Sequence, residues 1–361
     1  MSRDRDAVLR RRIFTQRLVG PKLPQPEDVV RLLTAVQSQE YAHGFWSLGM
    51  RTEGPTYADV KKAFDEGRIL RTHMLRTTWH FVTPADIRWI LAATSPRVLT
   101  VFGSHFRSLG LDERTQQEIS ERVVKALEGG NHLTRKEIGA ELERQGVTLG
   151  EERLTYIVMG AELRGLICSG PMRKAQHTYA VLDERVPPGP TYDRDEAQAE
   201  LAARFFKGHG PASLTDFTRW SSLTITEARN PIQGSADKLD SIKVDGQPLW
   251  FDPTAPRPRS TPLTAHLLPL YDEALLTYPK LNFATAPGHP HPPDMQLFTG
   301  SIIVGVRNVG TWRRTISNKT LTIETDLAPG LDDRSQAAVQ KATQRLTEFL
   351  GHRSEQHKLS R

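Results

Sequence analysis

The most regular part of the sequence is residues 111–182, LDERTQQEISERVVKALEGGNHLTRKEIGAELERQGVTLGEERLTYIVMGAELRGLICSGPMRKAQHTYAVL. Apolar residues recur at helical spacing from 111 to 128, and a Gly-Gly pair ends that pattern. Thr134 and Glu137 then have the spacing of a capping box, in which a hydroxyl and a carboxylate satisfy the first amides of a helix. The sequence therefore predicts two successive helices here.

A third helix is predicted from 150 to 165, after which the apolar period changes to two. Strands are expected over 166–168 and 178–181, joined by a tip that contains Arg173 and Lys174. Three helices and a hairpin are typical of a winged helix-turn-helix, in which the third helix enters the major groove and the hairpin contacts the DNA backbone. Such modules also serve as interaction scaffolds, so this segment alone leaves both readings open.

Weaker forms of the same pattern occur on both sides of this segment, including a predicted helix over 26–37. The length of 361 residues allows two or three units with cores of their own. We predict an α+β protein with three tandem winged helix-turn-helix units, followed by a C-terminal β-barrel with a covering helix. The expected domains are 1–110, the N-terminal winged-helix unit with the catalytic motif; 111–186, the second winged helix; 191–252, the third; and 260–361, the β-barrel and terminal helix.

The composition favours a polyanionic partner and excludes several other classes of protein. There are 48 Lys and Arg against 42 Asp and Glu, which gives a net charge of +6. No apolar run is long enough to span a membrane, and the charged N-terminus lacks the apolar core of an export signal. A single cysteine, Cys168, excludes an internal disulfide and a Cys-x-x-Cys zinc site. We expect a cytoplasmic protein.

Two polar clusters could carry chemistry. Gln37 and Gln39 stand at the end of the predicted helix over 26–37, and read without context they are an ordinary surface feature. The second cluster lies on two adjoining strands over 73–80. Strand alternation places Arg76 and His80 on one face of the second strand and Trp79 on the other. A hairpin with satisfied polar side chains is the alternative to a substrate pocket formed by Arg76, Trp79 and His80.

These clusters belong to a longer series of motifs that resembles the AlkZ/YcaQ-like superfamily of bacterial winged-helix DNA glycosylases. The motifs, in chain order, are AVQSQEY at 35–41, FWSLGMR at 45–51, RTHMLRTTWHFV at 71–82, ICSG at 167–170, LDERVP at 182–187, YDE at 271–273 and GTWRRT at 310–315. Together they span nearly the whole chain.

The resemblance implies a C-shaped protein that excises alkylated purines, including bulky adducts and interstrand crosslinks. It places Gln37 and Gln39 at the outer positions of the family's catalytic motif, which is Gln, an aliphatic residue and then Gln or Asp. Ser38 takes the place of the aliphatic residue, and Thr77 stands where many relatives have proline. No cofactor and no metal are implied, because the sequence has no P-loop, no Gly-x-Gly-x-x-Gly after a strand and no His-Glu-x-x-His.

Amides alone suit this chemistry. Cleavage of an N-glycosidic bond passes through an oxocarbenium-like sugar, and a neutral leaving group needs an acid to protonate it. A purine alkylated at N7 or N3 is already cationic, so its departure needs no acid. The carbonyl oxygens of Gln37 and Gln39 would then position a water and stabilise the developing sugar cation.

A bulky or crosslinked base cannot enter a snug pocket, so an open channel lined by basic residues is expected. The candidates for phosphate contacts are Arg10, Arg11, Arg12, Arg173, Lys174, Arg313 and Arg314. The expected partner is double-stranded DNA carrying alkylated purines, bound by a monomer. A non-catalytic winged-helix DNA-binding protein or transcriptional regulator, and a partner-binding scaffold, remain alternatives.

Overall fold

The structure is a computed structural model that describes residues 3–234, 238–255, 263–288, 299–317, 320–351 and 356–360. Contacts divide the chain into two compact units. The first unit, called the catalytic-motif unit below, comprises residues 1–61, 204–216 and 236–361, and the second, the helical unit, comprises 62–203 and 217–235. Helices α4 (Tyr57–Asp65), α10 (Arg194–His209) and α11 (Leu214–Ser221) each run from one unit into the other.

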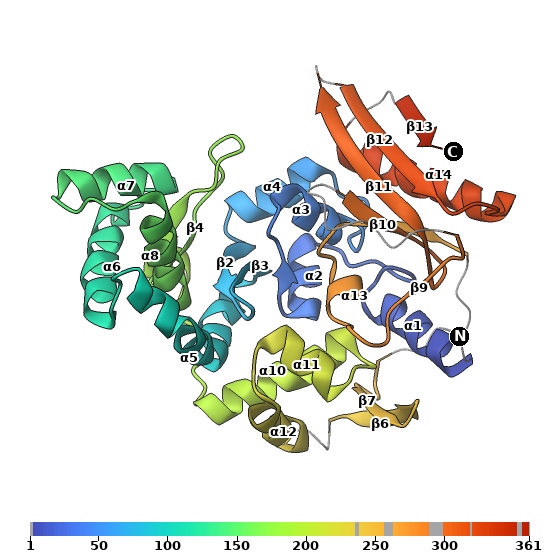
Figure 1. The fold of residues 1–361 in the computed structure, drawn as a ribbon, viewed down its shortest axis with the longest axis horizontal. Coiled ribbons are helices and arrows are strands. Elements are labelled where there is room, and N and C mark those ends of the chain that lie inside the picture. Colours follow the sequence, from blue (N-terminus) through green and yellow to red (C-terminus); the bar gives the residue numbers. More distant parts are fainter. Residues whose placement is uncertain are drawn as a thin grey trace. The chain divides into compact units, whose positions relative to one another are not determined.

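The helical unit contains the segment 111–182 and confirms the elements that its sequence predicts (Figure 1). Its helices are α5 (Pro84–Ser108), α6 (Glu113–Leu127), α7 (Arg135–Arg144), α8 (Glu151–Leu163), α9 (Leu182–Arg185) and α12 (Ile225–Gly234). Its hairpins pair β2 (Leu70–Met74) with β3 (Thr78–Val82) and β4 (Ile167–Ser169) with β5 (Tyr179–Val181), both antiparallel. The apolar faces of α6, α7 and α8 share one core with the end of α5 and with the β4–β5 hairpin.

The predicted capping box is present at the start of α7. The Glu137 amide donates to the Thr134 hydroxyl, and the Thr134 amide donates to the Glu137 carboxylate at 2.8 Å. The core of this segment therefore forms where periodicity places it, and the cap fixes the residue at which α7 begins.

The catalytic-motif unit contains the N-terminal and C-terminal parts of the chain. Its helices are α1 (Arg3–Thr15), α2 (Pro26–Leu33), α3 (Tyr41–Gly49), α13 (Glu273–Leu276) and α14 (Asp333–Phe349). Its strands are β1 (Val36–Gln37), β6 (Asp240–Val244), β7 (Gln247–Phe251), β8 (Ala265–Leu268), β9 (Ala284–Thr285), β10 (Thr299–Val304), β11 (Arg307–Ser317), β12 (Thr320–Leu327) and β13 (Gln356–Ser360).

The C-terminal sheet is open within the described residues, whereas the sequence predicted a barrel. The strand order is β13-β12-β11-β10-β8, with β9 paired to β11, and no pairing joins β13 to β8. Helix α14 packs against β8 and β10 as the predicted covering helix (Figure 1). Buried Trp312 on β11 fills the approach to Gly300, where an added Cβ would lie 2.2 Å from the indole nitrogen. No described helix is long and apolar enough to cross a membrane.

Candidate active site

The glutamine motif follows the end of a helix and does not lie on it. Helix α2 ends at Leu33 because Thr34 has φ +68°, outside the right-handed helical region, and the chain then enters the short strand β1. The predicted helix over 26–37 is therefore wrong in its last four residues. A helix would turn the side chains of Gln37 and Gln39 about 200° apart. Strand β1 ends at Gln37, and Gln39 lies in the bend that follows it, so helical geometry does not separate the two side chains. Gln37 is buried and Gln39 half-buried.

The strand that contains the first glutamine of the motif is held by a carboxylate from far along the chain. The backbone N–H of Gln37 donates to Glu273 Oε1 at 2.9 Å, and the Glu273 side chain is fully buried. The other oxygen, Oε2, accepts from the Thr277 hydroxyl at 3.0 Å and lies 3.5 Å from His209 Nε2. One buried carboxylate therefore fixes the backbone at the first glutamine.

Helix α3, which follows the motif, is held by Asp272, the residue before Glu273. Arg51, just after α3, donates from Nη1 and Nη2 to the two oxygens of Asp272 at 2.9 and 2.8 Å, and both side chains have no exposed surface. Ser47 on α3 donates to Asp272 Oδ2 at 2.8 Å. Asp272 also caps α13, because its Oδ1 accepts from the Ala274 amide. The Asp272-Glu273 pair thus contacts the chain on both sides of the motif.

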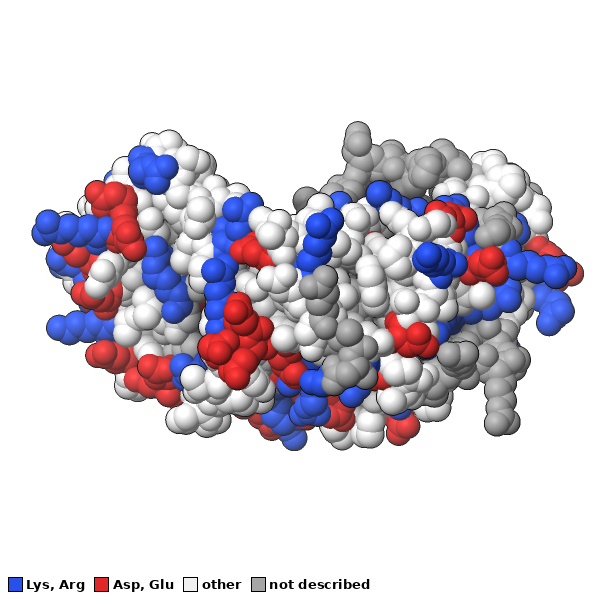
Figure 2. All heavy atoms as spheres, turned by 90° about the horizontal axis from the view of Figure 1, so that it is seen from below, with Lys and Arg blue, Asp and Glu red and all other residues white. Residues whose placement is uncertain are grey.

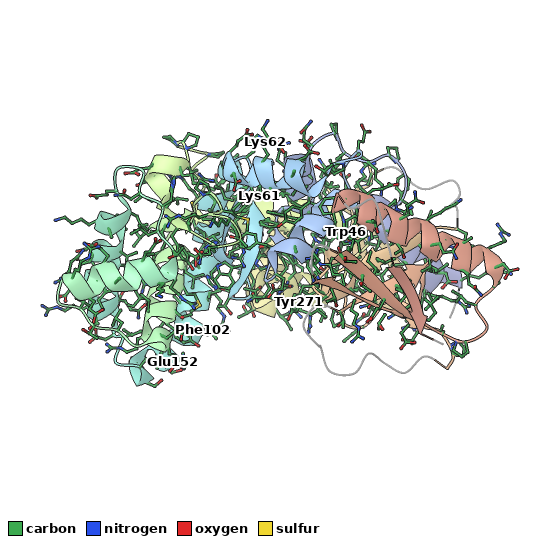
Figure 3. All side chains as sticks on the ribbon, turned by 90° about the horizontal axis from the view of Figure 1, so that it is seen from above. Trp46, Lys61, Lys62, Phe102, Glu152 and Tyr271 are labelled. Carbon is green, nitrogen blue, oxygen red and sulfur yellow. The ribbon has the colours of Figure 1, made fainter. Side chains whose placement is uncertain are left out.

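Aromatic residues fix the other face of α3. Trp46 on α3 is labelled in Figure 3. Its indole N–H donates to the Leu267 carbonyl at 2.8 Å, and its ring lies 5.2 Å from that of Phe349 on α14. His43, four residues after Gln39, lies 5.8 Å from the Trp312 ring. Burial, with a smaller contribution from the charge of Arg314, lowers the pKa of His43 to about 4. His43 is therefore neutral at pH 7.

The residues predicted to line a substrate pocket lie in the helical unit. Arg76 is at the turn between β2 and β3, beside Leu75 and Thr77, which both have positive φ. His80 is buried in the hairpin, with Nδ1 2.8 Å from the Thr78 carbonyl. Trp79 is half-buried, and a substrate pocket formed by these three residues stays a prediction.

Sequence reasoning missed the strongest polar contact of that hairpin, between His73 and Glu162. His73 Nδ1 lies 2.5 Å from Glu162 Oε2, and Glu162 has no exposed surface. The His73 ring lies 4.2 Å from that of Trp79, and the Arg71 guanidinium lies 4.3 Å from the Trp79 ring centroid. The signal was a glutamate inside the apolar face of α8, a position that requires a partner.

The predicted phosphate contacts have different environments. Arg11 and Arg12 are buried in the catalytic-motif unit, where Arg11 stacks on Phe251 and Arg12 on Tyr278. Arg12 also donates to the Pro211 carbonyl at 2.7 Å and lies 3.6 Å from Asp216. Both side chains therefore contribute to packing inside this unit, and phosphate contact by Arg11 and Arg12 stays a prediction.

The other basic candidates lie at or near the surface. Arg10 and Lys174 are exposed, and Arg314 is half-buried. Arg173 is paired with Glu137 at 2.6 Å and Arg313 with Glu324, so each already has a carboxylate partner. Figure 2 shows Lys and Arg side chains interspersed with Asp and Glu on the visible face. The charge is therefore distributed and forms no single basic field on that face.

Comparison with known proteins identifies the family. The sequence model of the DNA glycosylase AlkZ-like family matches residues 30–349. The chain belongs to the AlkZ-like DNA glycosylase family. An interstrand DNA cross-link repair glycosylase of Streptomyces sahachiroi is 26% identical over 235 residues, which are 62% of this chain and 63% of that relative. The solved structure of the Streptomyces sahachiroi DNA glycosylase AlkZ matches with a TM-score of 0.79 at 21% identity, over 99% of this chain and 100% of that one.

The buried histidines of the catalytic-motif unit predict sensitivity to acid. Burial lowers the pKa of His43 to about 4 and that of His266 to about 3. As the pH falls below about 6.5, these two histidines therefore bind protons in the unfolded chain but not in the folded chain. We expect the free energy of unfolding to fall between pH 6.5 and 5, by up to about 1.4 kcal/mol per pH unit for each group. Urea unfolding at pH 7, 6 and 5 measures this slope.

The His43→Gln variant supplies the control for that titration. It removes one of the two groups, so its stability should depend less steeply on pH than that of the wild type. Equal slopes for the two proteins would show that His43 is protonated normally in the folded state.

Proposed function

We propose that the protein is a monofunctional DNA glycosylase that hydrolyses the N-glycosidic bond of cationic alkylated purines, N7-alkylguanine or N3-alkyladenine, in double-stranded DNA. The observation that carries this proposal is the buried Gln37, fixed through its backbone by Glu273 and followed two residues later by Gln39, in a chain of the AlkZ-like DNA glycosylase family. A non-catalytic DNA-binding role is not favoured by this membership.

The two amides are suited to the demands of this reaction. The leaving purine is already cationic and needs no proton, so the site has only to position a water and stabilise the oxocarbenium-like sugar. Carbonyl oxygens of Gln37 and Gln39 act on the water and the deoxyribose. Neutral His43 adds no positive charge near a developing cation. Ser38, buried between the two glutamines, replaces an aliphatic residue in the motif.

We extend the proposal to bulky adducts and interstrand crosslinks, because a relative at 26% identity is named as an interstrand DNA cross-link repair glycosylase. The protein would act as a monomer. Residues 111–186 would contact DNA as a winged helix, mainly through the β4–β5 tip. Helix α8 is not expected to enter the groove, because it begins with two exposed glutamates, Glu151 and Glu152. Their negative charges would repel the negatively charged phosphates of DNA.

Loss of the two amides should abolish base release. With duplex DNA containing N7-methylguanine, we expect the wild type to release the free base and the Gln37→Ala/Gln39→Ala double variant to be at least about 100-fold slower, because interactions that stabilise a transition state have this magnitude. Single-turnover assays with chromatographic detection of the base measure it.

Gln340→Ala is the matched control, since Gln340 is an exposed glutamine on α14, outside the proposed DNA contacts. It should release the base at the wild-type rate. Absence of release by the wild type, or undiminished release by the double variant, would contradict the proposed function.

Phosphate contacts are tested through salt dependence. We expect Lys174→Ala and Arg10→Ala each to reduce the slope of log binding constant against log salt by about one unit, on damaged and undamaged duplexes alike. Fluorescence anisotropy at several salt concentrations measures the slope. Lys341→Ala, which changes an exposed lysine on α14 outside the predicted contacts, is the comparator. A slope that Lys174→Ala leaves unchanged would remove the β4–β5 tip from the DNA contacts.

A further inference from the structure

Three helices of the catalytic-motif unit, α2, α13 and α10, supply residues near the backbone of Gln37. Helix α2 ends three residues before β1, α13 carries Glu273, and the last turn of α10 carries His209. The approach between α10 and α2 is close enough to require glycine, because a Cβ added at Gly208 would lie 2.3 Å from the Leu32 carbonyl oxygen. The end of α2, just before the strand that carries Gln37, is therefore packed closely against the last turn of α10.

Glu273 is placed at the centre of this support. Its carboxylate has no exposed surface, and it reaches Gln37 across 236 positions of sequence. The side-chain hydroxyl of Thr277, one turn along α13, holds the second oxygen. His209, stacked on Phe205 at 4.8 Å between ring centroids, lies 3.5 Å from the same oxygen. The position of the carboxylate is thus itself determined by two further side chains.

We propose that Glu273 is a positioning residue for the reaction, which fixes the Gln37 backbone so that its side-chain amide keeps its place relative to Gln39 and the attacking water. This inference rests on the proposed function. Residues next to reacting groups need tight placement, since a displacement of 1 Å costs about 100-fold in rate. A buried backbone N–H left without its acceptor would also move to find another partner.

Substitutions at Glu273 can distinguish its role as a hydrogen-bond acceptor for the Gln37 backbone from an effect of its negative charge. A glutamine at 273 keeps an acceptor oxygen for the Gln37 N–H but removes the negative charge. An alanine removes both the acceptor and the volume. If Glu273 acts by holding the backbone, Glu273→Gln should retain the wild-type turnover within about threefold, whereas Glu273→Ala should lose about 10- to 100-fold.

The experiment compares single-turnover excision of N7-methylguanine, duplex affinity and thermal unfolding in four variants and the wild type. Positioning predicts that Glu273→Ala slows excision while the duplex affinity stays within about twofold, and that Thr277→Val, which removes one support, has a smaller loss of the same kind. Val339→Ala, a buried truncation on α14 in the same unit, controls for lost stability and should retain its excision rate.

Each outcome decides one point. Loss of excision in Glu273→Gln as large as in Glu273→Ala would overturn the proposal in favour of a charge effect. Equal excision by Glu273→Ala and Val339→Ala would also overturn it. If Glu273→Ala does not fold, Thr277→Val and Glu273→Gln decide, and an unchanged rate in Thr277→Val would then be the contrary result. A wild type without base release would instead sink the proposed function, which keeps the two failures apart.

Discussion

The ion pair between Arg51 and Asp272 is the constraint on which the candidate site depends. Both side chains are fully buried, and the two hydrogen bonds between them are matched by further bonds from Arg51 to the Gln16 carbonyl and from Ser47 to Asp272. Removing one partner of such a pair leaves a buried charge and costs about 3–5 kcal/mol. The pair joins α3 to the start of α13, and the next residue along is Glu273.

This arrangement gives a physical reason for two adjacent acidic residues. Asp272 holds the end of the helix that follows the glutamine motif, and Glu273 holds the backbone of Gln37, the first residue of the motif. The motif is therefore anchored at both ends by neighbouring carboxylates, while the side chain of Gln39 stays half-buried. Asp272 and Glu273 belong to the YDE motif at 271–273, one of those that the family resemblance rests on.

Local patterns predicted most of the secondary structure, and the family resemblance located the glutamine motif, but neither predicted the contacts that support it. Periodicity located α6 and α8, and a capping box located the start of α7, because these signals lie within a few residues of each other. The end of α2 was missed because Thr34 adopts positive φ with no glycine or proline to signal it. Arg12 was predicted as a phosphate contact, and its buried contacts with Pro211 and Asp216 were not predicted because these residues are some 200 positions away in the sequence. The contact between Gln37 and Glu273 was missed for the same reason, because the two residues are 236 positions apart. The sheet was predicted to be a closed barrel because strand spacing does not reveal which edge strands pair.

The proposed chemistry requires that two amides suffice because the leaving base is already a cation. This is tested most directly by comparing single-turnover release of N7-methylguanine and of hypoxanthine, a neutral base, from otherwise identical duplexes. We expect release of N7-methylguanine and no measurable release of hypoxanthine, since no acid of the motif protonates a neutral leaving group. Comparable rates for the two bases would contradict it, because they would require a general acid that Gln37 and Gln39 cannot supply.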